Sequence, residues 1–264
     1  YNFRTLYSQD LPIIFHYLIS IISKVILPIS IFLSIVQKRK IMVLILLCCS
    51  TLIFGYTQHK GPFFYPIFVI GLYSIISNKD IITQLKFSYL LFISLGILLF
   101  VFNNEITFFI SSIFFRRALF VPSEVNFQYF EYFSNHPYIY WARNFFTFGL
   151  IDYPYDLPTA NVIGEFAYNN YEKSANTGWL GSGFMQAGYL GLIIYSFILS
   201  IIMSILDNLS KQTGKNLVIA FTIIPMITVF TSSDLPTSVI THGLLVAIII
   251  IMYISPSKEY LYND

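Results

Sequence analysis

The chain has 264 residues, of which 56% are hydrophobic and 11% are charged, and its formal net charge is +2. Soluble domains usually carry about 25% charged residues, so this chain has too little charge to cover a globular surface in water. The mean hydropathy of +0.70 therefore predicts a protein embedded in lipid and excludes the ordinary soluble enzymes. Nothing in the composition indicates a nucleic-acid partner.

The sequence begins at Tyr1, without an initiator methionine. Its first ten residues, YNFRTLYSQD, are polar and do not resemble a signal peptide. We expect that the natural N-terminus lies upstream and that helices preceding Tyr1 are missing from this chain.

Seven apolar segments are candidates for membrane-spanning helices, each of which needs about 20 residues, in a range of roughly 17–25. They predict an all-α, polytopic membrane protein with a single membrane domain over 1–264. Pro28 in the first segment and Pro225 in the sixth are expected to kink their helices, because proline removes a backbone donor. The predicted spans are 11–36, 41–58, 62–78, 85–103, 184–206, 216–233 and 238–254.

Basic residues in the connecting segments predict the orientation of these spans. Eight of them fall on one side of the membrane if the spans alternate, and the short segments on the other side hold only Arg4 and Lys60. Since basic residues gather in cytoplasmic segments, the first side is predicted to be the cytoplasm. The eight residues are Lys38, Arg39, Lys40, Lys79, Lys86, Lys211, Lys215 and Lys258.

Residues 104–183 are predicted to form one large extracytoplasmic loop between the fourth and fifth spans. The loop holds 22 aromatic residues among its 80, far more than a disordered linker tolerates. We expect it to lie on the membrane as amphipathic helices joined by turns. Its rings suit stacking on carbohydrate and also suit anchoring in the membrane surface, and composition alone favours anchoring.

The first half of the loop predicts two helices. Residues 106–120 are typical of an interfacial or re-entrant helix. A proline–serine pair then marks the start of a second helix over 123–134. In this helix Phe127, Phe130 and Phe133 are spaced by three along one face.

The second half of the loop predicts irregular backbone and a tight turn. Residues 152–161 hold two prolines and cannot form a regular helix. The glycines within 176–191 allow a tight turn and close helix packing where the chain enters the fifth span.

Arg116 and Arg117 follow an apolar segment at the predicted outer edge of the membrane. Guanidinium groups stay charged and bind phosphate oxygens through a planar fork, so the pair is a candidate anion site. Contact with lipid headgroup phosphates is the alternative. His59 and Lys60, in a short outer segment, could present a further cation or form a solvated turn. Arg143 could bind an anion or pair with a loop carboxylate.

A general base could come from His136 or from a loop carboxylate, and no carboxylate stands out from the others. We choose Asp152, because irregular segments often present side chains to ligands, and Glu165. Solvation at the protein surface is the alternative for all three residues. The loop carboxylates are Glu105, Glu124, Glu131, Asp152, Asp156, Glu165 and Glu172.

No spacing of metal ligands is visible, and we expect neither a metal nor another cofactor. Cys48 and Cys49 are adjacent in an apolar run and cannot form an ordinary structural disulfide. The sequence also lacks a Walker loop, a dinucleotide-binding glycine pattern and a nucleophile elbow.

Three stretches resemble the Wzy-type O-antigen and capsule repeat-unit polymerases. FFRRALFVPSEVNFQYFEYFSNHPYIYW (114–141) is similar to the large periplasmic loop of that family. ANTGWLGSGFMQAGYLGL (175–192) resembles the segment bearing Asn and Gly that returns such loops to the membrane, and HKGPFF (59–64) resembles a short outer loop with a basic residue. Members usually have more spans than are seen here, which fits the missing N-terminus.

The resemblance implies an integral-membrane glycosyltransferase with a GT-C-like helical architecture, in the bacterial inner membrane with its long loop in the periplasm. Such enzymes join oligosaccharide repeat units carried on undecaprenyl pyrophosphate, a step of polysaccharide and lipopolysaccharide biosynthesis. The implied partners are this lipid-linked oligosaccharide, the bilayer, and a chain-length regulator and a flippase of the same pathway.

The family's reaction suggests roles for the candidate residues. Arg116 and Arg117 would neutralise the departing pyrophosphate, because a fixed cation stabilises charge that develops in the transition state. His136, Asp152 or Glu165 would take the proton of the acceptor hydroxyl. The predicted substrate-binding residues are His59, Lys60, Arg143, Asn176 and Tyr129.

Two other functions stay open. An O-antigen ligase shares the architecture and the donor but uses a lipid A core as acceptor. A flippase for lipid-linked oligosaccharide is the second, although transporters often show repeated halves and midplane charges. Here no repeat is visible, and only Lys24 lies near mid-membrane, where it snorkels or faces a wet interior. A non-catalytic scaffold would not account for the basic pair and the ring-rich loop.

Overall fold

The computed structural model describes residues 12–77, 81–101, 104–112, 116, 120–142, 144 and 147–254. Within these residues every regular element is helical and no strand occurs, which confirms the all-α prediction. Contacts divide the chain into two compact units. The single membrane domain expected from the sequence stays a prediction. The first unit comprises Tyr1–Ile81, Ile202–Met226 and Thr237–Asp264, and the second comprises Ile82–Ile201 and Ile227–Pro236.

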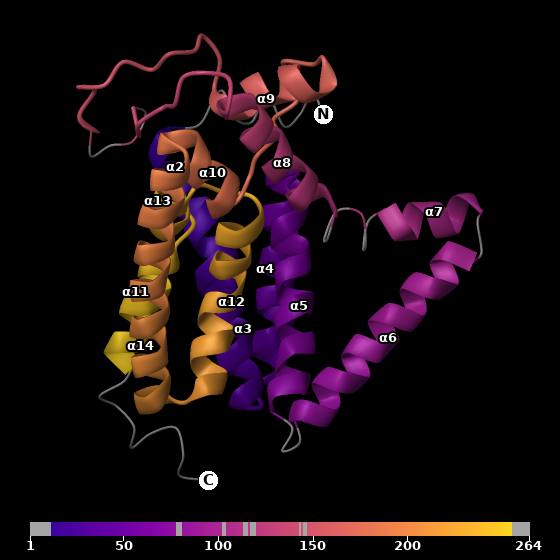
Figure 1. The fold of residues 1–264 in the computed structure, drawn as a ribbon. Coiled ribbons are helices and arrows are strands. Elements are labelled where there is room, and N and C mark those ends of the chain that lie inside the picture. Colours follow the sequence, from indigo (N-terminus) through magenta and orange to yellow (C-terminus); the bar gives the residue numbers. More distant parts are fainter. Residues whose placement is uncertain are drawn as a thin grey trace. The chain divides into compact units, whose positions relative to one another are not determined.

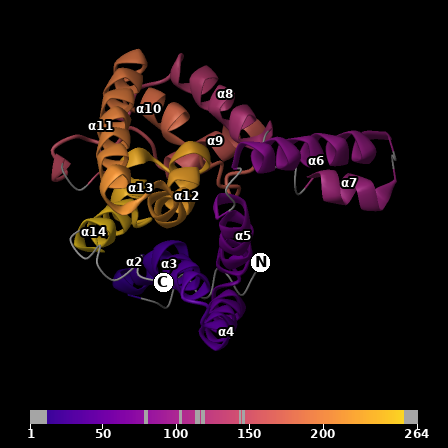
Figure 2. The ribbon, with the colours of Figure 1, turned by 90° about the horizontal axis from the view of Figure 1, so that it is seen from below.

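The first unit is built around a layer of helices from the N-terminal third of the chain. In Figures 1 and 2, α3 lies beside both α4 and α5, and these two also pack on each other. The ring of Phe32 in α3 meets Tyr73 and Phe221 edge-on. The elements of this part are α2 (Ile13–Ile21), η1 (Ile22–Ile26), α3 (Leu27–Val36), α4 (Lys40–Thr57) and α5 (Lys60–Ile76).

Three helices are long and apolar enough to cross a membrane, which indicates a membrane protein. They are Ile14–Val36, Lys40–Thr57 and Tyr189–Thr213, close to the predicted spans 11–36, 41–58 and 184–206. Shorter apolar helices overlap the other four predicted spans, so a total of seven stays a prediction. These are Lys60–Ile76, Ser88–Ile97, Lys215–Thr231 and Leu244–Ile254.

The first predicted span contains a π-helical turn, Ile22–Ile26, just before Pro28. There the Leu27 N–H bonds to the Ile22 carbonyl, five residues earlier. Proline lacks an N–H and its ring crowds the carbonyl four residues before it. The wider turn accommodates that crowding, so the irregularity expected at Pro28 takes the form of a π-bulge.

The last predicted span, 238–254, is not one continuous helix. α13 (Leu235–Ile240) covers only its first three residues, and α14 (Leu244–Ile254) begins after Gly243. Gly243 has a φ of +83°, and a Cβ there would lie 2.7 Å from a methyl group of Val25. Both observations require glycine at the break. Hydropathy alone does not reveal the break, because apolar residues flank it on both sides.

The second unit holds the predicted loop together with most of α6 and the adjoining parts of α11 and α12. Figures 1 and 2 show α8 and α10 side by side, and their contact forms the centre of the unit. The buried core beneath them includes Val125, Phe133, Ile163 and Phe184. The elements are α6 (Ile81–Val101), α7 (Glu105–Ser111), α8 (Val121–Phe133), α9 (Thr159–Tyr168), α10 (Trp179–Ala187) and the start of α11 (Tyr189–Thr213), with the end of α12 (Lys215–Thr231).

The predicted helix over 123–134 is present as α8, but its buried face differs from the predicted row of phenylalanines. Phe127 is 72% exposed, whereas Phe133 is buried. The buried row is Val125, Tyr129 and Phe133, spaced by four. Only the last of the three predicted rings therefore belongs to this row.

Other local predictions for the loop agree with the structure in part, since the last three residues of the segment predicted to be irregular are helical. The predicted irregular segment 152–161 is non-helical as far as Pro158, after which α9 begins at Thr159. α10 ends at Gly188, whose φ is +59°, and α11 starts at the next residue. The tight turn expected among the glycines is confirmed. The predicted helix over 106–120 begins as α7, and the described residues Ser112, Arg116 and Phe120 are π-helical, while 113–115 and 117–119 lie outside the described residues.

Candidate functional site

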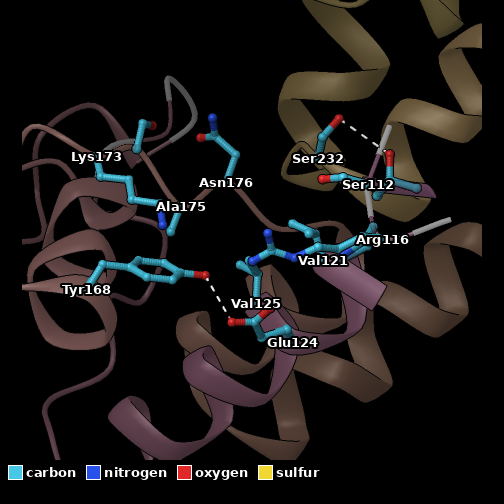
Figure 3. Close-up of a pocket in the computed structure, with 13 residues that line it drawn as sticks. Ser112, Arg116, Val121, Glu124, Val125, Tyr168, Lys173, Ala175, Asn176 and Ser232 are labelled. Atoms are coloured by element: carbon cyan, nitrogen blue, oxygen red, sulfur yellow. Dashed lines mark hydrogen bonds between the residues drawn. The ribbon is translucent and has the colours of Figure 1, made fainter. Parts of the chain in front are cut away.

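A pocket of about 470 Å³ lies within the second unit, between α8 and the segment that leads from α9 to α10 (Figure 3). This volume lies in the range of small-molecule sites, which is about 300–1,000 Å³. We call it the Arg116 pocket. Its lining residues are Ser112, Arg116, Val121, Pro122, Glu124, Val125, Tyr168, Lys173, Ser174, Ala175, Asn176, Thr231 and Ser232.

The first turns of α8 form one wall of the pocket. Pro122 stands in the first turn, where its missing N–H leaves no intrahelical bond unmade. Val125 is buried in the core while Glu124, one position earlier, is exposed. The helix therefore fixes the Glu124 backbone against the core and leaves its carboxylate at the pocket.

The segment Lys173–Asn176 forms the facing wall, and hydrogen bonds hold it in place. The buried Tyr129 hydroxyl of α8 donates to the Ala175 carbonyl at 3.0 Å. The Ala175 N–H donates to the Ala160 carbonyl of α9 at 2.8 Å. The wall is thus tied to two helices through one residue.

The start of α10 is capped by a side chain from α8. The Asn126 Oδ1 atom accepts from the Gly181 N–H at 2.9 Å and from the Thr177 hydroxyl at 2.7 Å. The natural cap position, Gly178, has no side chain that could do this. A Cβ at Gly178 would overlap the Phe230 carbonyl, so α10 also lies close to the α12 end that carries Thr231 and Ser232.

Two cations and one carboxylate face the pocket. In Figure 3 the side chains of Arg116 and Lys173 extend towards each other from opposite walls, and Glu124 lies to one side of the gap. Among the described residues, no carboxylate forms an ion pair with either cation. The lining therefore carries an excess of positive charge, which favours an anionic ligand.

Tyr168 links the opposite charges. The Lys173 ammonium lies over its ring, 2.8 Å from the ring centre. Its hydroxyl lies 3.4 Å from the Glu124 Oε1 atom and accepts from the Gln128 amide at 3.2 Å. The Gln128 amide also lies 3.4 Å from the same carboxylate oxygen. These long contacts orient Glu124 without burying it.

Two of the predicted site residues, Arg116 and Asn176, line this pocket together although they are 60 positions apart (176 − 116). Arg117 and Arg143 lie outside the described residues. Their predicted roles stay predictions.

The other predicted loop residues do not line the pocket. Tyr129 is buried, and burial raises the pKa of its hydroxyl above the usual range. It supports the wall through Ala175 and does not face a substrate. The His136 ring stacks on Tyr132 at 3.9 Å and bonds to that residue's carbonyl at 2.8 Å. Asp152 and Glu165 are exposed elsewhere on the unit.

His59 and Lys60 belong to the first unit, where His59 precedes α5 and Lys60 opens it. Lys60 is exposed, at the helix end where the dipole disfavours a cation. Their predicted contact with substrate is not tested by the geometry of the second unit.

Sequence patterns did not single out Lys173 and Tyr168, and Glu124 was one of seven equivalent carboxylates. Lys173 lies in a polar stretch, NNYEKSAN, with no periodicity or motif. Only the return of that stretch along α9 brings it opposite Arg116. The clearest local sign is Gly164, where a Cβ would overlap the Lys173 carbonyl.

A second carboxylate, Asp234, lies in a hydrogen-bonded chain away from the pocket lining. Its Oδ1 atom accepts from the Tyr195 hydroxyl at 2.7 Å and from the Leu235 N–H at 2.9 Å. The Trp141 ring N–H in turn donates to the Tyr195 hydroxyl at 3.0 Å. Burial raises the pKa of Asp234, and these donors oppose the shift. These hydrogen bonds connect Trp141 of the loop to Tyr195 of α11.

Comparison with protein-family models, with curated proteins and with solved structures finds no match to this chain.

Proposed function

We propose that this chain is a membrane glycosyltransferase that polymerises oligosaccharide repeat units carried on undecaprenyl pyrophosphate, at the outer face of the bacterial inner membrane. Three features support the proposal: the apolar helices, the resemblance of the loop to Wzy-type polymerases, and the Arg116 pocket. The apolar helices supply a surface for the polyprenyl tail, which a soluble enzyme would lack.

The observation that carries the proposal is the pair of cations facing one pocket. A diphosphate gains negative charge as its bond to the sugar breaks, so cations fixed beside it stabilise the transition state more than the ground state. Arg116 would form a planar fork to two phosphate oxygens, and Lys173 would act as a point charge from the other wall. Asn176, at the rim, would bond a sugar hydroxyl.

The first prediction concerns the Arg116 guanidinium. Arg116→Ala should lower polymerisation by about 10²–10³-fold, the usual loss when one transition-state donor is removed. Arg116→Lys should retain part of the activity, since it keeps the charge and loses the fork. The measurement is the chain-length ladder of surface glycan in a deletion strain that expresses each variant at equal level.

Lys211→Ala is the matched control, because Lys211 is an exposed cation paired with Asp207 on α11 and does not line the pocket. It should give the wild-type ladder. A wild-type ladder from Arg116→Ala would remove the pyrophosphate role. Accumulation of single lipid-linked units in the deletion strain supports a polymerase, whereas accumulation of lipid-linked polymer would identify a ligase.

A further inference from the structure

We propose that Glu124 is the general base that takes the proton from the acceptor sugar hydroxyl. This inference rests on the proposed glycosyl transfer and assigns its proton-transfer step to one residue. Among the described residues that line the Arg116 pocket, Glu124 is the single carboxylate. It therefore shares one cavity with the cations that would hold the donor diphosphate.

The other carboxylates of the second unit are placed differently. Asp234 already accepts hydrogen bonds from the Tyr195 hydroxyl and the Leu235 N–H. Asp152 and Glu165 are exposed and do not line the pocket. A base must come within hydrogen-bond reach of the hydroxyl while that hydroxyl faces the donor, and among the described carboxylates only Glu124 meets this condition.

One oxygen of Glu124 is held and the other is available. Tyr168 and Gln128 both approach Oε1, each at 3.4 Å. In the described part of the chain no donor is bonded to Oε2. A carboxylate accepts through both oxygens, so Oε2 can accept from a sugar hydroxyl while Oε1 keeps the group oriented. Contacts of this length tighten when a substrate completes the site.

The reaction that this arrangement supports balances without a further reagent. The acceptor hydroxyl oxygen attacks the anomeric carbon of the donor sugar, and a new glycosidic bond forms. The bond from that carbon to the phosphate oxygen breaks, and the lipid diphosphate leaves with the electron pair. The hydroxyl proton passes to Glu124, which later releases it to water. Arg116 and Lys173 neutralise the leaving group across the same pocket.

The experiment compares two steps in the full-length protein reconstituted in lipid nanodiscs. Binding is measured with undecaprenyl pyrophosphate, and transfer is measured with the lipid-linked repeat unit of the source strain. Glu124→Gln should slow transfer by about 10²–10⁴-fold, the usual contribution of a general base. It should leave binding within about twofold of wild type, because the base acts only in the transition state. Glu124→Asp should fall between the two.

Glu131→Gln is the control, since it removes the same charge from an exposed position of the same helix that does not line the pocket. It should transfer at the wild-type rate. Wild-type transfer by Glu124→Gln, alongside impaired Arg116→Ala, would overturn the base and leave the proposed function standing. Loss of binding by Glu124→Gln would also overturn it, because the residue would then hold the donor or the fold. If the wild-type protein transfers no sugar, both proposals fail.

Discussion

At the scale of single residues, two carboxylates of the second unit have opposite surroundings. Asp234 accepts two short hydrogen bonds, from the Tyr195 hydroxyl and from a backbone N–H. Glu124 is exposed, and its hydrogen-bond contacts with the described residues are two long ones, to Tyr168 and Gln128. A carboxylate whose hydrogen bonds are made within the fold contributes to stability. A carboxylate at a pocket with only long contacts can still accept a hydrogen bond from a substrate.

Asp234 gives a prediction about the pH dependence of stability. Burial raises the pKa of Asp234, so the folded state binds this proton more tightly than the unfolded chain does. The resulting contribution is complete below the unfolded pKa of about 4 and is lost as pH rises through the folded pKa. Asp234→Asn keeps an acceptor oxygen and cannot titrate. The wild-type protein should therefore lose thermal stability relative to this variant as pH rises from 4 to 8, measured by melting in detergent. Parallel melting curves across that range would contradict the raised pKa.

At the scale of elements, the junction of α10 and α11 positions the pocket. The two helices meet at Gly188, and a Cβ at Gly191 would overlap the Gly183 carbonyl. α10 in turn packs on α8 through Phe184 and Phe130, whose rings are 4.6 Å apart. A displacement at this junction would therefore reach the helix that carries Glu124.

Gly191→Ala should destabilise the protein by about 1–3 kcal/mol, because a methyl group forced between close backbones strains both helices. Gly71→Ala is the control. Gly71 is also helical, but a Cβ there meets nothing within 4 Å, so its substitution gains helix propensity without a clash. The difference in thermal unfolding between the two variants measures the packing cost. Equal melting temperatures would show that α10 and α11 do not approach closely at this glycine.

The sequence predicted those elements that depend on local signals. Prolines marked the irregular segment before α9, and glycines marked the turn at Gly188. The buried face of α8 was mispredicted because only the phenylalanines were considered. Glu124, Gln128 and Glu131 are spaced by four and three and share one polar face, and the buried row lies away from that face. At the site, Arg116 and Asn176 had recognisable chemistry. Lys173 did not, because its position depends on tertiary hydrogen bonds such as that from Ala175 to Ala160.

One helix of the chain, α11, begins in the unit that holds the pocket and is long and apolar enough to cross a membrane. It has 25 residues and is therefore about 37 Å long, which exceeds the roughly 30 Å hydrocarbon core of a bilayer. Its first turns adjoin α10 and bond to Trp141 through Tyr195. Its last turn carries Lys211, one of the basic residues predicted to be cytoplasmic. The two ends of one spanning helix must lie at opposite membrane faces.

This orientation is tested by labelling with a membrane-impermeant maleimide in intact cells. Cys48 and Cys49 are first replaced by alanine, and a single cysteine is placed at Asp156 or Lys211, both exposed positions. The 156 variant should be labelled at once, because its segment precedes α9 and is predicted to be extracytoplasmic. The 211 variant should be labelled only after the inner membrane is permeabilised. Labelling of both positions in intact cells would mean that α11 does not span the membrane. The reverse pattern would place the Arg116 pocket in the cytoplasm, on the wrong face for a periplasmic transferase.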